Sequence, residues 1–187
     1  MIIETIISTI DKNGKVNFAP FGIKKEKKKI FISPYIPSKT LDNLKLTKCA
    51  VINYTNDSRF FVNCIVGEKN FEKKKCKMIK NFFLDKCQSY DEVLVEEIID
   101  HEERPTFVCK VIYSANRERF DGHNRAKSSL IEACILASRV NLIENEKIIN
   151  ELDYLSISID KTAGDEEKKS WAKIYKYIKN KMLKPNA

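Results

Sequence analysis

The chain has 187 residues, of which 32% are charged and 43% hydrophobic, as in a soluble globular protein with a substantial core, and this composition excludes wholesale disorder. No apolar run reaches the roughly 20 residues needed to span a bilayer, and the first residues lack the basic start of a secretory signal. The sequence therefore predicts a cytoplasmic protein without a membrane segment.

The net charge of +8 is concentrated in the first third of the chain. Residues 1–67 hold eleven Lys and Arg against five Asp and Glu, which gives +6, and residues 68–187 carry the remaining +2. A local positive excess suits phosphate-bearing ligands and also nucleic acid. We interpret the five lysines within residues 24–29 as a solvated turn, because aromatic residues are not interleaved with them as base stacking requires.

The six cysteines contain no C-x-x-C pair. Only two histidines, His101 and His123, could join them, so the sequence predicts no structural zinc site. In a cytosolic chain we expect most of these cysteines to be reduced and buried. Cys49 and Cys64 could face each other across a predicted hairpin, and the sequence leaves a bridge between them open.

The first half of the chain predicts a small antiparallel barrel. Asn13-Gly14 between two β-prone runs is a strong hairpin signal. Pro20 lacks an N–H group and is expected at a sheet edge or a bulge. A short helix is expected over residues 37–44, with Ser38 near its N-cap. The predicted strands cover residues 2–10, 16–23, 29–33, 49–54 and 59–66.

The second half begins with a predicted amphipathic helix over residues 69–84, where apolar residues recur at helical spacing. Two antiparallel strands and then three helices follow. We expect a barrel domain at 1–120 and a helical C-terminal region at 121–187, which makes the fold class α+β. The two later strands are predicted at 92–100 and 105–114, and the helices at 126–143, at 148–160 and from Asp165 onward.

One stretch suggests a ligand site. A strand containing Ala19, Pro20 and Gly22 leaves main-chain groups unpaired and carries little side-chain bulk, so a flat ligand could lie close against it. The hydroxyls of Ser38 and Thr40, the Lys39 amine and the free N–H groups of a helix start could hold an anion. We predict that this stretch holds a phosphorylated aromatic cofactor, with flavin mononucleotide (FMN) as the best candidate.

Several separated blocks of the sequence resemble one family. The segments NFAPFG, SPYIPSKTLDNL, AVINYTND, NRAKSSLIEACILASR and DKTAGDEEKKSW, in this order, resemble the archaeal and bacterial family known as domain of unknown function 447. The resemblance covers almost the whole chain. It implies a flavin reductase relative, with an FMN-binding split β-barrel, an added helical C-terminal region and a homodimeric assembly.

The resemblance also implies a set of cofactor-binding residues. The flavin ring is expected to lie against a strand, and the phosphate and ribityl chain at a helix start. Two further side chains, from the same or a second subunit, are expected near the ring edge. Turn chemistry explains the last of these, Asp57, equally well. The ring residues are Asn17, Ala19, Pro20, Phe21 and Gly22, the phosphate and ribityl residues are Ser38, Lys39, Thr40 and Asn43, and the ring-edge residues are Asn53 and Asp57.

The sequence assigns no catalytic residue. Neither histidine lies in a nucleophile motif, and no G-x-G-x-x-G or G-K-[ST] loop is present. Arg125 could neutralise an anion at the cofactor edge or pair with an acid, and we favour the pairing. Lys161 and Thr162 are expected only to break and cap a helix.

Three functions are consistent with these observations. The first is a flavin-dependent oxidoreductase that exchanges hydride or electrons between FMN and a partner, either a nicotinamide or another reduced carrier. The second is a non-catalytic flavin-binding scaffold. The third and least favoured is a nucleic-acid binder that uses the basic first third of the chain.

Overall fold

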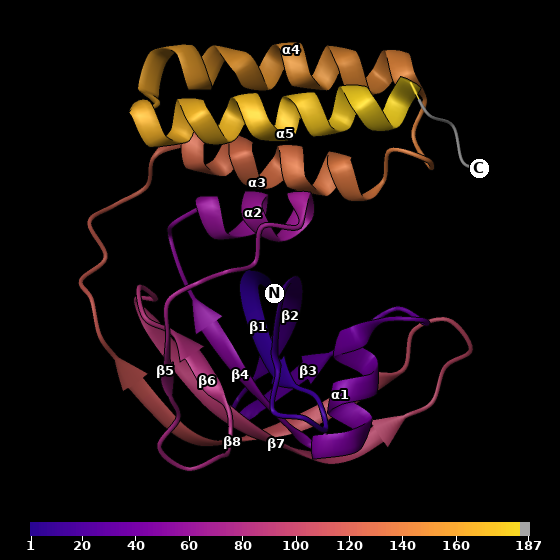
Figure 1. The fold of residues 1–187 in the computed structure, drawn as a ribbon, viewed down its shortest axis with the longest axis vertical. Coiled ribbons are helices and arrows are strands. Elements are labelled where there is room, and N and C mark those ends of the chain that lie inside the picture. Colours follow the sequence, from indigo (N-terminus) through magenta and orange to yellow (C-terminus); the bar gives the residue numbers. More distant parts are fainter. Residues whose placement is uncertain (184–187) are drawn as a thin grey trace. The chain divides into compact units, whose positions relative to one another are not determined.

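Six strands close into an antiparallel barrel in the computed structural model, which describes residues 1–183 (Figure 1). The strands follow one another around the barrel in the order β1-β2-β3-β8-β7-β4, and β4 pairs with β1 to close it. The predicted antiparallel barrel and the α+β fold class are therefore confirmed. The strands are β1 Ile2–Ile10, β2 Val16–Glu26, β3 Lys29–Ile32, β4 Cys49–Tyr54, β7 Ser89–Ile99 and β8 Thr106–Asn116.

The β1–β2 hairpin forms where the Asn-Gly signal predicted it. Gly14 has a φ of +78°, a conformation that glycine adopts without steric cost. The Asp11 carboxylate accepts the backbone N–H groups of Asn13 and Lys15, both at 2.9 Å. The bond from Lys15 N–H, followed by that from Asn13 and the nearby lysine charges, keeps the pKa of Asp11 below its usual value although burial acts in the opposite direction.

The barrel core is built from alternate residues of the strands. Ile7, Ile23, Ile52 and Phe107 are fully buried, and side chains of α1 (Lys39–Thr47) pack against the same cluster. Burial of this kind contributes about 1.5–3 kcal/mol for each large apolar side chain. The predicted short helix is confirmed as α1, which packs at the core because its apolar residues fall on one face.

One predicted strand of the barrel is wrong. Arg59–Val66 forms the helix α2, which ends at Gly67 with a φ of +91°. A short apolar run fits a buried strand and a buried helix equally well, so periodicity could not separate them. The turn before it selects the helix, because the Asp57 carboxylate accepts the backbone N–H of Arg59 and also binds its guanidinium.

The helix predicted over residues 69–84 is also wrong. This segment contains a small hairpin of β5 Lys73–Lys75 and β6 Phe82–Leu84. The fully buried Glu92 carboxylate accepts the backbone N–H groups of residues 77, 78 and 79 in the connecting loop, at 2.7, 2.8 and 3.0 Å. Tertiary contacts therefore override the helical spacing of the apolar residues in this segment.

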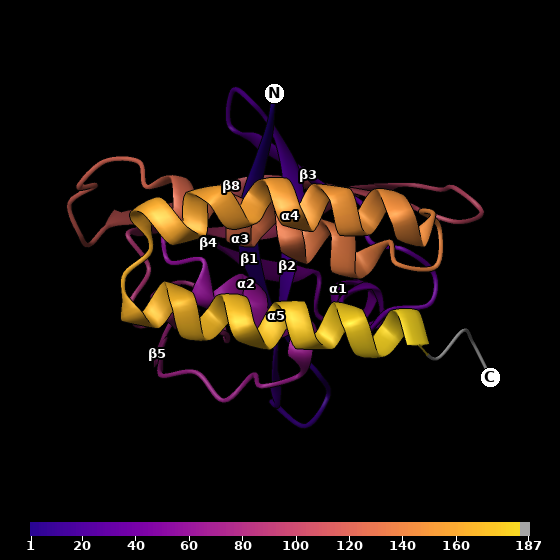
Figure 2. The same cartoon turned by 90° about the horizontal axis from the view of Figure 1, so that it is seen from above.

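Helices make up a second unit of the chain. The fold separates into a barrel unit, residues 1–55 and 69–120, and a helical unit, residues 56–68 and 121 onward. In the helical unit α2 packs with α3 (Arg125–Ser138) and α5 (Asp165–Leu183), and α3 also contacts α4 (Asn145–Thr162) (Figure 2). Ile174 and Ile178 of α5 are fully buried, which confirms core packing at these two positions of the apolar stripe.

The helix predicted over residues 126–143 is too long, because α3 ends at Ser138.

Thr162 has a cap role, but toward α3: its hydroxyl accepts the backbone N–H of Ala126 at 3.1 Å, and its carbonyl accepts a bond from the Asn124 side chain at 2.9 Å. Within residues 1–183 no helix has the length and apolar content that crossing a membrane requires.

All six cysteines are free thiols. Five of them are buried, and Cys76 is half-buried. The hairpin that was expected to bring Cys49 opposite Cys64 does not form, because residues 59–66 are helical. The open question of a bridge is thus answered for this structure: Cys49 and Cys64 are not linked.

Candidate functional site

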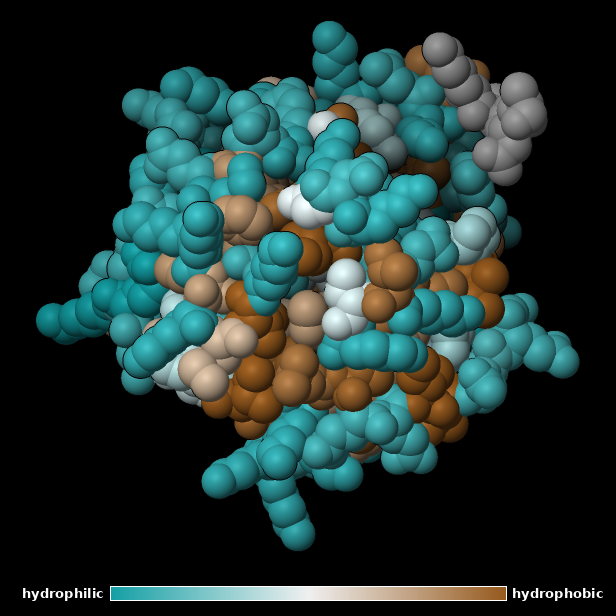
Figure 3. Space-filling model, turned by 60° about the horizontal axis from the view of Figure 1, so that its bottom comes forward, coloured by the Kyte–Doolittle hydropathy of each residue, from teal (hydrophilic) through white to brown (hydrophobic). Residues whose placement is uncertain are grey.

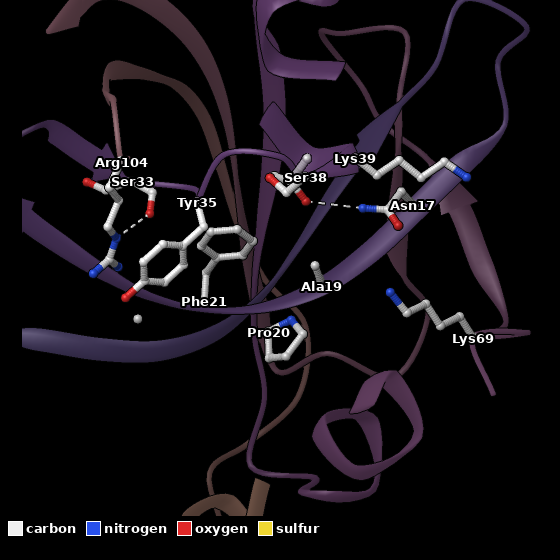
Figure 4. A pocket seen from close by; sticks show the side chains of 12 residues that line it. Asn17, Ala19, Pro20, Phe21, Ser33, Tyr35, Ser38, Lys39, Lys69 and Arg104 are labelled. Carbon is white, nitrogen blue, oxygen red and sulfur yellow. Dashed lines mark hydrogen bonds between the residues drawn. The ribbon is translucent and has the colours of Figure 1, made fainter. Parts of the chain in front are cut away.

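A cavity of about 350 Å³ lies beside β2 in the barrel unit (Figure 4). In the described barrel, residues 17–23 of β2 pair with β1 alone, because the pairing with β3 begins only at Lys24. The other edge of this stretch therefore presents main-chain groups without a strand partner. Pro20 lies at this open edge in an unbroken β1–β2 register, so the predicted edge position is confirmed and a bulge is excluded.

Twelve residues line this first cavity, and eight of them belong to the set predicted from the sequence. The strand, the segment after β3 and the start of α1 contribute most of them. The eight predicted residues are Asn17, Ala19, Pro20, Phe21, Gly22, Ser38, Lys39 and Thr40; the four that sequence reasoning missed are Ser33, Tyr35, Lys69 and Arg104.

The charge of the first cavity is entirely positive. Lys39, Lys69 and Arg104 line it, and no carboxylate does. Within residues 1–183 none of the three cations forms an ion pair. Lys39 is close enough to Asp11 to help lower the pKa of that carboxyl, although the two groups do not meet. Three uncompensated cations around one cavity create a local potential that favours an anionic ligand.

Lys39 and the two hydroxyls lie at the start of α1. Ser38 is the N-cap in an extended conformation, with φ −157° and ψ 147°, and its Oγ accepts the N–H of Leu41 at 3.3 Å. Thr40 is 3% exposed, and its Oγ1 accepts a hydrogen bond from the Asn17 side chain at 3.2 Å. Each hydroxyl still has its own hydrogen to donate, at a helix end where the dipole favours negative charge.

Arg104 lies at the other end of the same cavity (Figure 4). Its Nε donates to the backbone carbonyl of Ser33 at 2.8 Å, and its guanidinium carbon is 4.7 Å from the centre of the Tyr35 ring. The neighbouring backbone is fixed as well, because Ile36 N–H donates to the Glu103 carbonyl at 2.9 Å. These contacts hold the guanidinium in place and leave its two terminal nitrogens available.

Gly22 is required by packing against β1. A Cβ atom at this position would lie 2.9 Å from Ile2 Cγ2 and 3.0 Å from Glu4 Oε1. The sequence suggested glycine here because a ligand approaches the strand, and the structure supplies a reason within the barrel itself. The two reasons are compatible, since Gly22 also lines the cavity.

Two family models cover most of the chain. The model described as "Protein of unknown function (DUF447) N-terminal domain" matches residues 3–118, and the model described as "Protein of unknown function (DUF447)" matches residues 124–176. The chain belongs to the DUF447 family. A comparison with curated proteins gives no match.

Solved structures share the fold of this DUF447 chain. The FMN-bound protein MM1853 from Methanosarcina mazei is similar at a TM-score of 0.81 and 22% identity, over 94% of each chain. Flavoredoxin from Methanosarcina acetivorans matches at a TM-score of 0.56 and 16% identity, over 64% of this chain and 70% of its own. A putative flavin reductase from Haemophilus somnus matches at a TM-score of 0.53 and 8% identity, over 61% of this chain and 80% of its own. At these identities the similarity establishes the split-barrel fold.

Two of the predicted cofactor residues lie in the interior of the DUF447 barrel and do not line the first cavity. Asn43 is 3% exposed and donates to Thr9 Oγ1 at 2.9 Å. Asn53 is fully buried: its Nδ2 donates to the Ile6 carbonyl at 2.8 Å, and its Oδ1 accepts Leu84 N–H at 2.8 Å. Both amides join separate segments of the barrel unit, which is a structural role.

The third, Asp57, belongs to the helical unit. Its carboxylate contacts the Arg59 guanidinium at 2.6 Å, and this bond is the main cause that raises the pKa of Arg59. The turn interpretation of Asp57 therefore has direct support. Arg125, for which we favoured pairing with an acid, is exposed at the start of α3 and forms no ion pair within residues 1–183.

The four residues that were missed differ in how visible they are in the sequence. Ser33 and Tyr35 lie between the third strand and the Ser38 helix start, inside the segment SPYIPSKTLDNL that resembles the DUF447 family. Lys69 and Arg104 come from distant loops, and nothing in their local sequence distinguishes them from other surface cations. Only the closed barrel brings them to the edge of β2.

Proposed function

We propose that this DUF447 protein binds FMN in the first cavity and acts as a flavin reductase-like oxidoreductase. One observation carries the proposal: three cations without an ion-pair partner in residues 1–183, four hydroxyls and an open strand edge line one cavity, and no carboxylate of the described residues lines it. FMN combines a dianionic phosphate with a flat ring that has a polar edge. The donors and the charge in the cavity fit both parts of this ligand.

The phosphate is proposed to lie at the start of α1. The hydroxyls of Ser38 and Thr40 donate to its oxygens, while Lys39 and Lys69 supply compensating charge. The N–H groups of the first helical turn, which have no acceptor within the helix, add to the same field. Charge-assisted hydrogen bonds of this kind are about twice as strong as neutral ones, so this end is expected to contribute most of the affinity.

The ring is proposed to lie along the open edge of β2. Main-chain groups near Ala19 and Pro20 face its polar edge, while the side chains of Phe21 and Tyr35 supply apolar surface that excludes water. When bound, the flavin supplies the hydride and electron transfer chemistry. Asn43 and Asn53 are left out of the proposed ligand set, because their amides are used inside the barrel.

An oxidoreductase is preferred over a passive flavin binder because structures named flavoredoxin and putative flavin reductase share the fold. A nicotinamide or another reduced carrier is the proposed electron donor. The nucleic-acid alternative loses support, since three lysines of the basic turn have carboxylate partners. The pairs are Lys24–Glu26 at 2.6 Å, Lys25–Asp91 at 3.0 Å and Lys29–Glu96 at 3.7 Å.

A homodimer is the proposed assembly. The barrel unit exposes several large apolar side chains, among them Leu46, Leu94 and Ile99, at 58%, 40% and 50%. Figure 3 shows a face on which apolar residues lie among hydrophilic ones. Exposed apolar residues of this kind are frequent at contacts between subunits. The cytoplasmic location expected from the sequence stays a prediction.

FMN titration tests the proposal. The wild-type chain is expected to quench flavin fluorescence saturably and to gain thermal stability with FMN. The double variant Lys39→Ala/Thr40→Ala is expected to bind FMN at least tenfold more weakly, while Lys45→Ala, on the same helix but outside the cavity, behaves as wild type. Wild-type protein that neither quenches FMN nor is stabilised by it would refute the proposal.

A redox titration separates the two flavin-binding functions. NADH and NADPH are each added without oxygen to the FMN-loaded chain, and the flavin absorption is followed. Bleaching that reverses on reoxidation supports the reductase. Retention of FMN with no bleaching by either nucleotide would favour the passive binder or another electron donor.

A further inference from the structure

A second cavity, of about 550 Å³, adjoins the first. The two share four lining residues, namely Gly22, Ser33, Tyr35 and Arg104. Nothing in the proposed FMN site uses this second space. Its volume is within the range of 300–1,000 Å³ that is typical of small-molecule sites.

Arg104 is the charged residue common to both cavities. Its Nε is held by the Ser33 carbonyl and its plane lies near the Tyr35 ring, so the terminal nitrogens are fixed in position without a carboxylate partner in the described chain. The loop that carries it is also fixed, because His101 Nδ1 accepts the backbone N–H groups of Glu103 and Arg104, both at 3.2 Å. A preorganised guanidinium binds carboxylate or phosphate oxygens in a bidentate manner.

The other charges at the second cavity point to the same residue. Lys24 lines it, but its amine is already 2.6 Å from the Glu26 carboxylate. Glu103 also lines it and is the one lining carboxylate. An anionic ligand therefore gains most from Arg104, at the end shared with the first cavity.

Aromatic surface lies next to this cation. Phe31 lines the second cavity alone, and Tyr35 lines both. The hydroxyls of Ser33 and Thr106, which also line it, bond each other at 2.8 Å and add a small polar surface between strand ends. Two rings beside one fixed guanidinium suit a ligand with a planar body and an acidic group.

We propose that the second cavity binds a planar organic anion, an aromatic carboxylate or phosphate, with Arg104 as its anchor. Because Arg104 and Tyr35 also border the first cavity, this ligand lies beside the proposed flavin as its second reactant. The reactant role rests on the proposed function, whereas binding of the anion does not.

The test uses the full chain without added FMN and benzoate as the probe, followed by calorimetry and by amide NMR shifts. We expect benzoate to bind and to shift the amide signals of residues 31, 35, 101–104 and 106. Arg104→Gln is expected to weaken binding at least tenfold, while Arg139→Gln, the same change in the helical unit, leaves it unchanged. Phe31→Leu, which alters only the second cavity, is expected to weaken binding about threefold.

Binding measurements with two further compounds define the class of ligand that the second cavity takes. Benzyl alcohol, which lacks the charge, is expected to bind at least tenfold more weakly than benzoate, and phenyl phosphate compared with benzoate decides between the two acidic groups. Absence of benzoate binding, or affinity unaffected by Arg104→Gln, overturns the inference. So does benzoate binding that FMN abolishes by competition, since the two ligands are assigned separate spaces.

The outcomes also separate this inference from the proposed function. Arg104-dependent benzoate binding by a chain that does not take up FMN would refute the function and keep the second site. FMN uptake with no benzoate binding would keep the function and refute the second site.

Discussion

The buried polar groups of the barrel interior have hydrogen-bond partners within the barrel, whereas the lysines around the first cavity have no ion-pair partner in residues 1–183. Glu92, Asn43 and Asn53 are buried and bonded to other parts of the barrel unit. Lys39 and Lys69, at the cavity, carry charges that no carboxylate of residues 1–183 pairs. A polar group with all its bonds made stabilises the fold, and an unpaired charge in a cavity is available to a ligand.

The largest expected effect of this difference is on stability. Glu92→Ala leaves three backbone N–H groups of the loop at 77–79 without their acceptor. We expect the free energy of unfolding, measured by urea denaturation, to fall by about 3 kcal/mol. FMN affinity of the folded variant should be unchanged, because Glu92 does not line the cavity. A variant as stable as wild type would show that water replaces the carboxylate.

Buried thiols make the interior sensitive to alkali. Burial raises the pKa of Cys87, Cys109 and Cys134 to about 12, from the ordinary 9.0. A thiol whose pKa is higher in the folded than in the unfolded chain makes its full contribution to stability below pH 9. This contribution is lost between pH 9 and 12, because the thiols of the unfolded chain ionise there. Summed over the three thiols, we expect the free energy of unfolding to drop by about 2 kcal/mol from pH 8 to pH 9.5.

The matched control for alkaline sensitivity is the triple Cys→Ala variant at these positions. Its unfolding free energy is expected to vary less between pH 8 and 10 than that of wild type, because the ionising thiols are gone. Equal slopes would assign the alkaline loss to other groups, such as the lysines.

A cavity cation should affect binding and leave stability unchanged. Lys69→Gln is expected to weaken FMN binding about tenfold and to change the melting temperature of the free chain by less than about 1 °C. Lys110→Gln, an exposed change on β8 that faces neither cavity, is the control. If Lys69→Gln lowered the free energy of unfolding by as much as it lowered the free energy of FMN binding, Lys69 would belong with the structural residues.

The smallest effect is expected at Asp57. Its ion pair with Arg59 is partly exposed, with 21% and 40% of the two side chains accessible, so Asp57→Asn should cost about 0.5 kcal/mol of stability. FMN affinity is expected to be unaffected. A clear loss of FMN binding would return Asp57 to the cofactor residues that the family resemblance implied.

The sequence predicts features whose physical cause is local. The Asn13-Gly14 turn, the Ser38 cap and the apolar face of α1 each depend on neighbouring residues, and all three are found in the structure. The eight cavity residues that were predicted come from one stretch of 24 residues, from Asn17 to Thr40, which the hairpin and the helix start bring together.

Features that depend on distant contacts were missed. The segment 69–84 has helical spacing, but Glu92, far along the chain, holds it as a hairpin loop. Asn53 is a plausible ligand by residue type, and only the barrel shows that its amide bonds Ile6 and Leu84. Arg104 becomes a cavity residue through barrel closure, which no local pattern contains.

The first cavity is proposed to bind a flavin through its phosphate. The most direct test compares the dissociation constants of FMN and riboflavin, which differ only in that group, for wild type and for Lys39→Gln/Lys69→Gln. We predict that wild type binds FMN at least a hundredfold more tightly than riboflavin, and that the variant loses most of this difference while its riboflavin affinity is unchanged. Equal affinity of the wild-type chain for FMN and riboflavin would contradict recognition of the phosphate by this cavity.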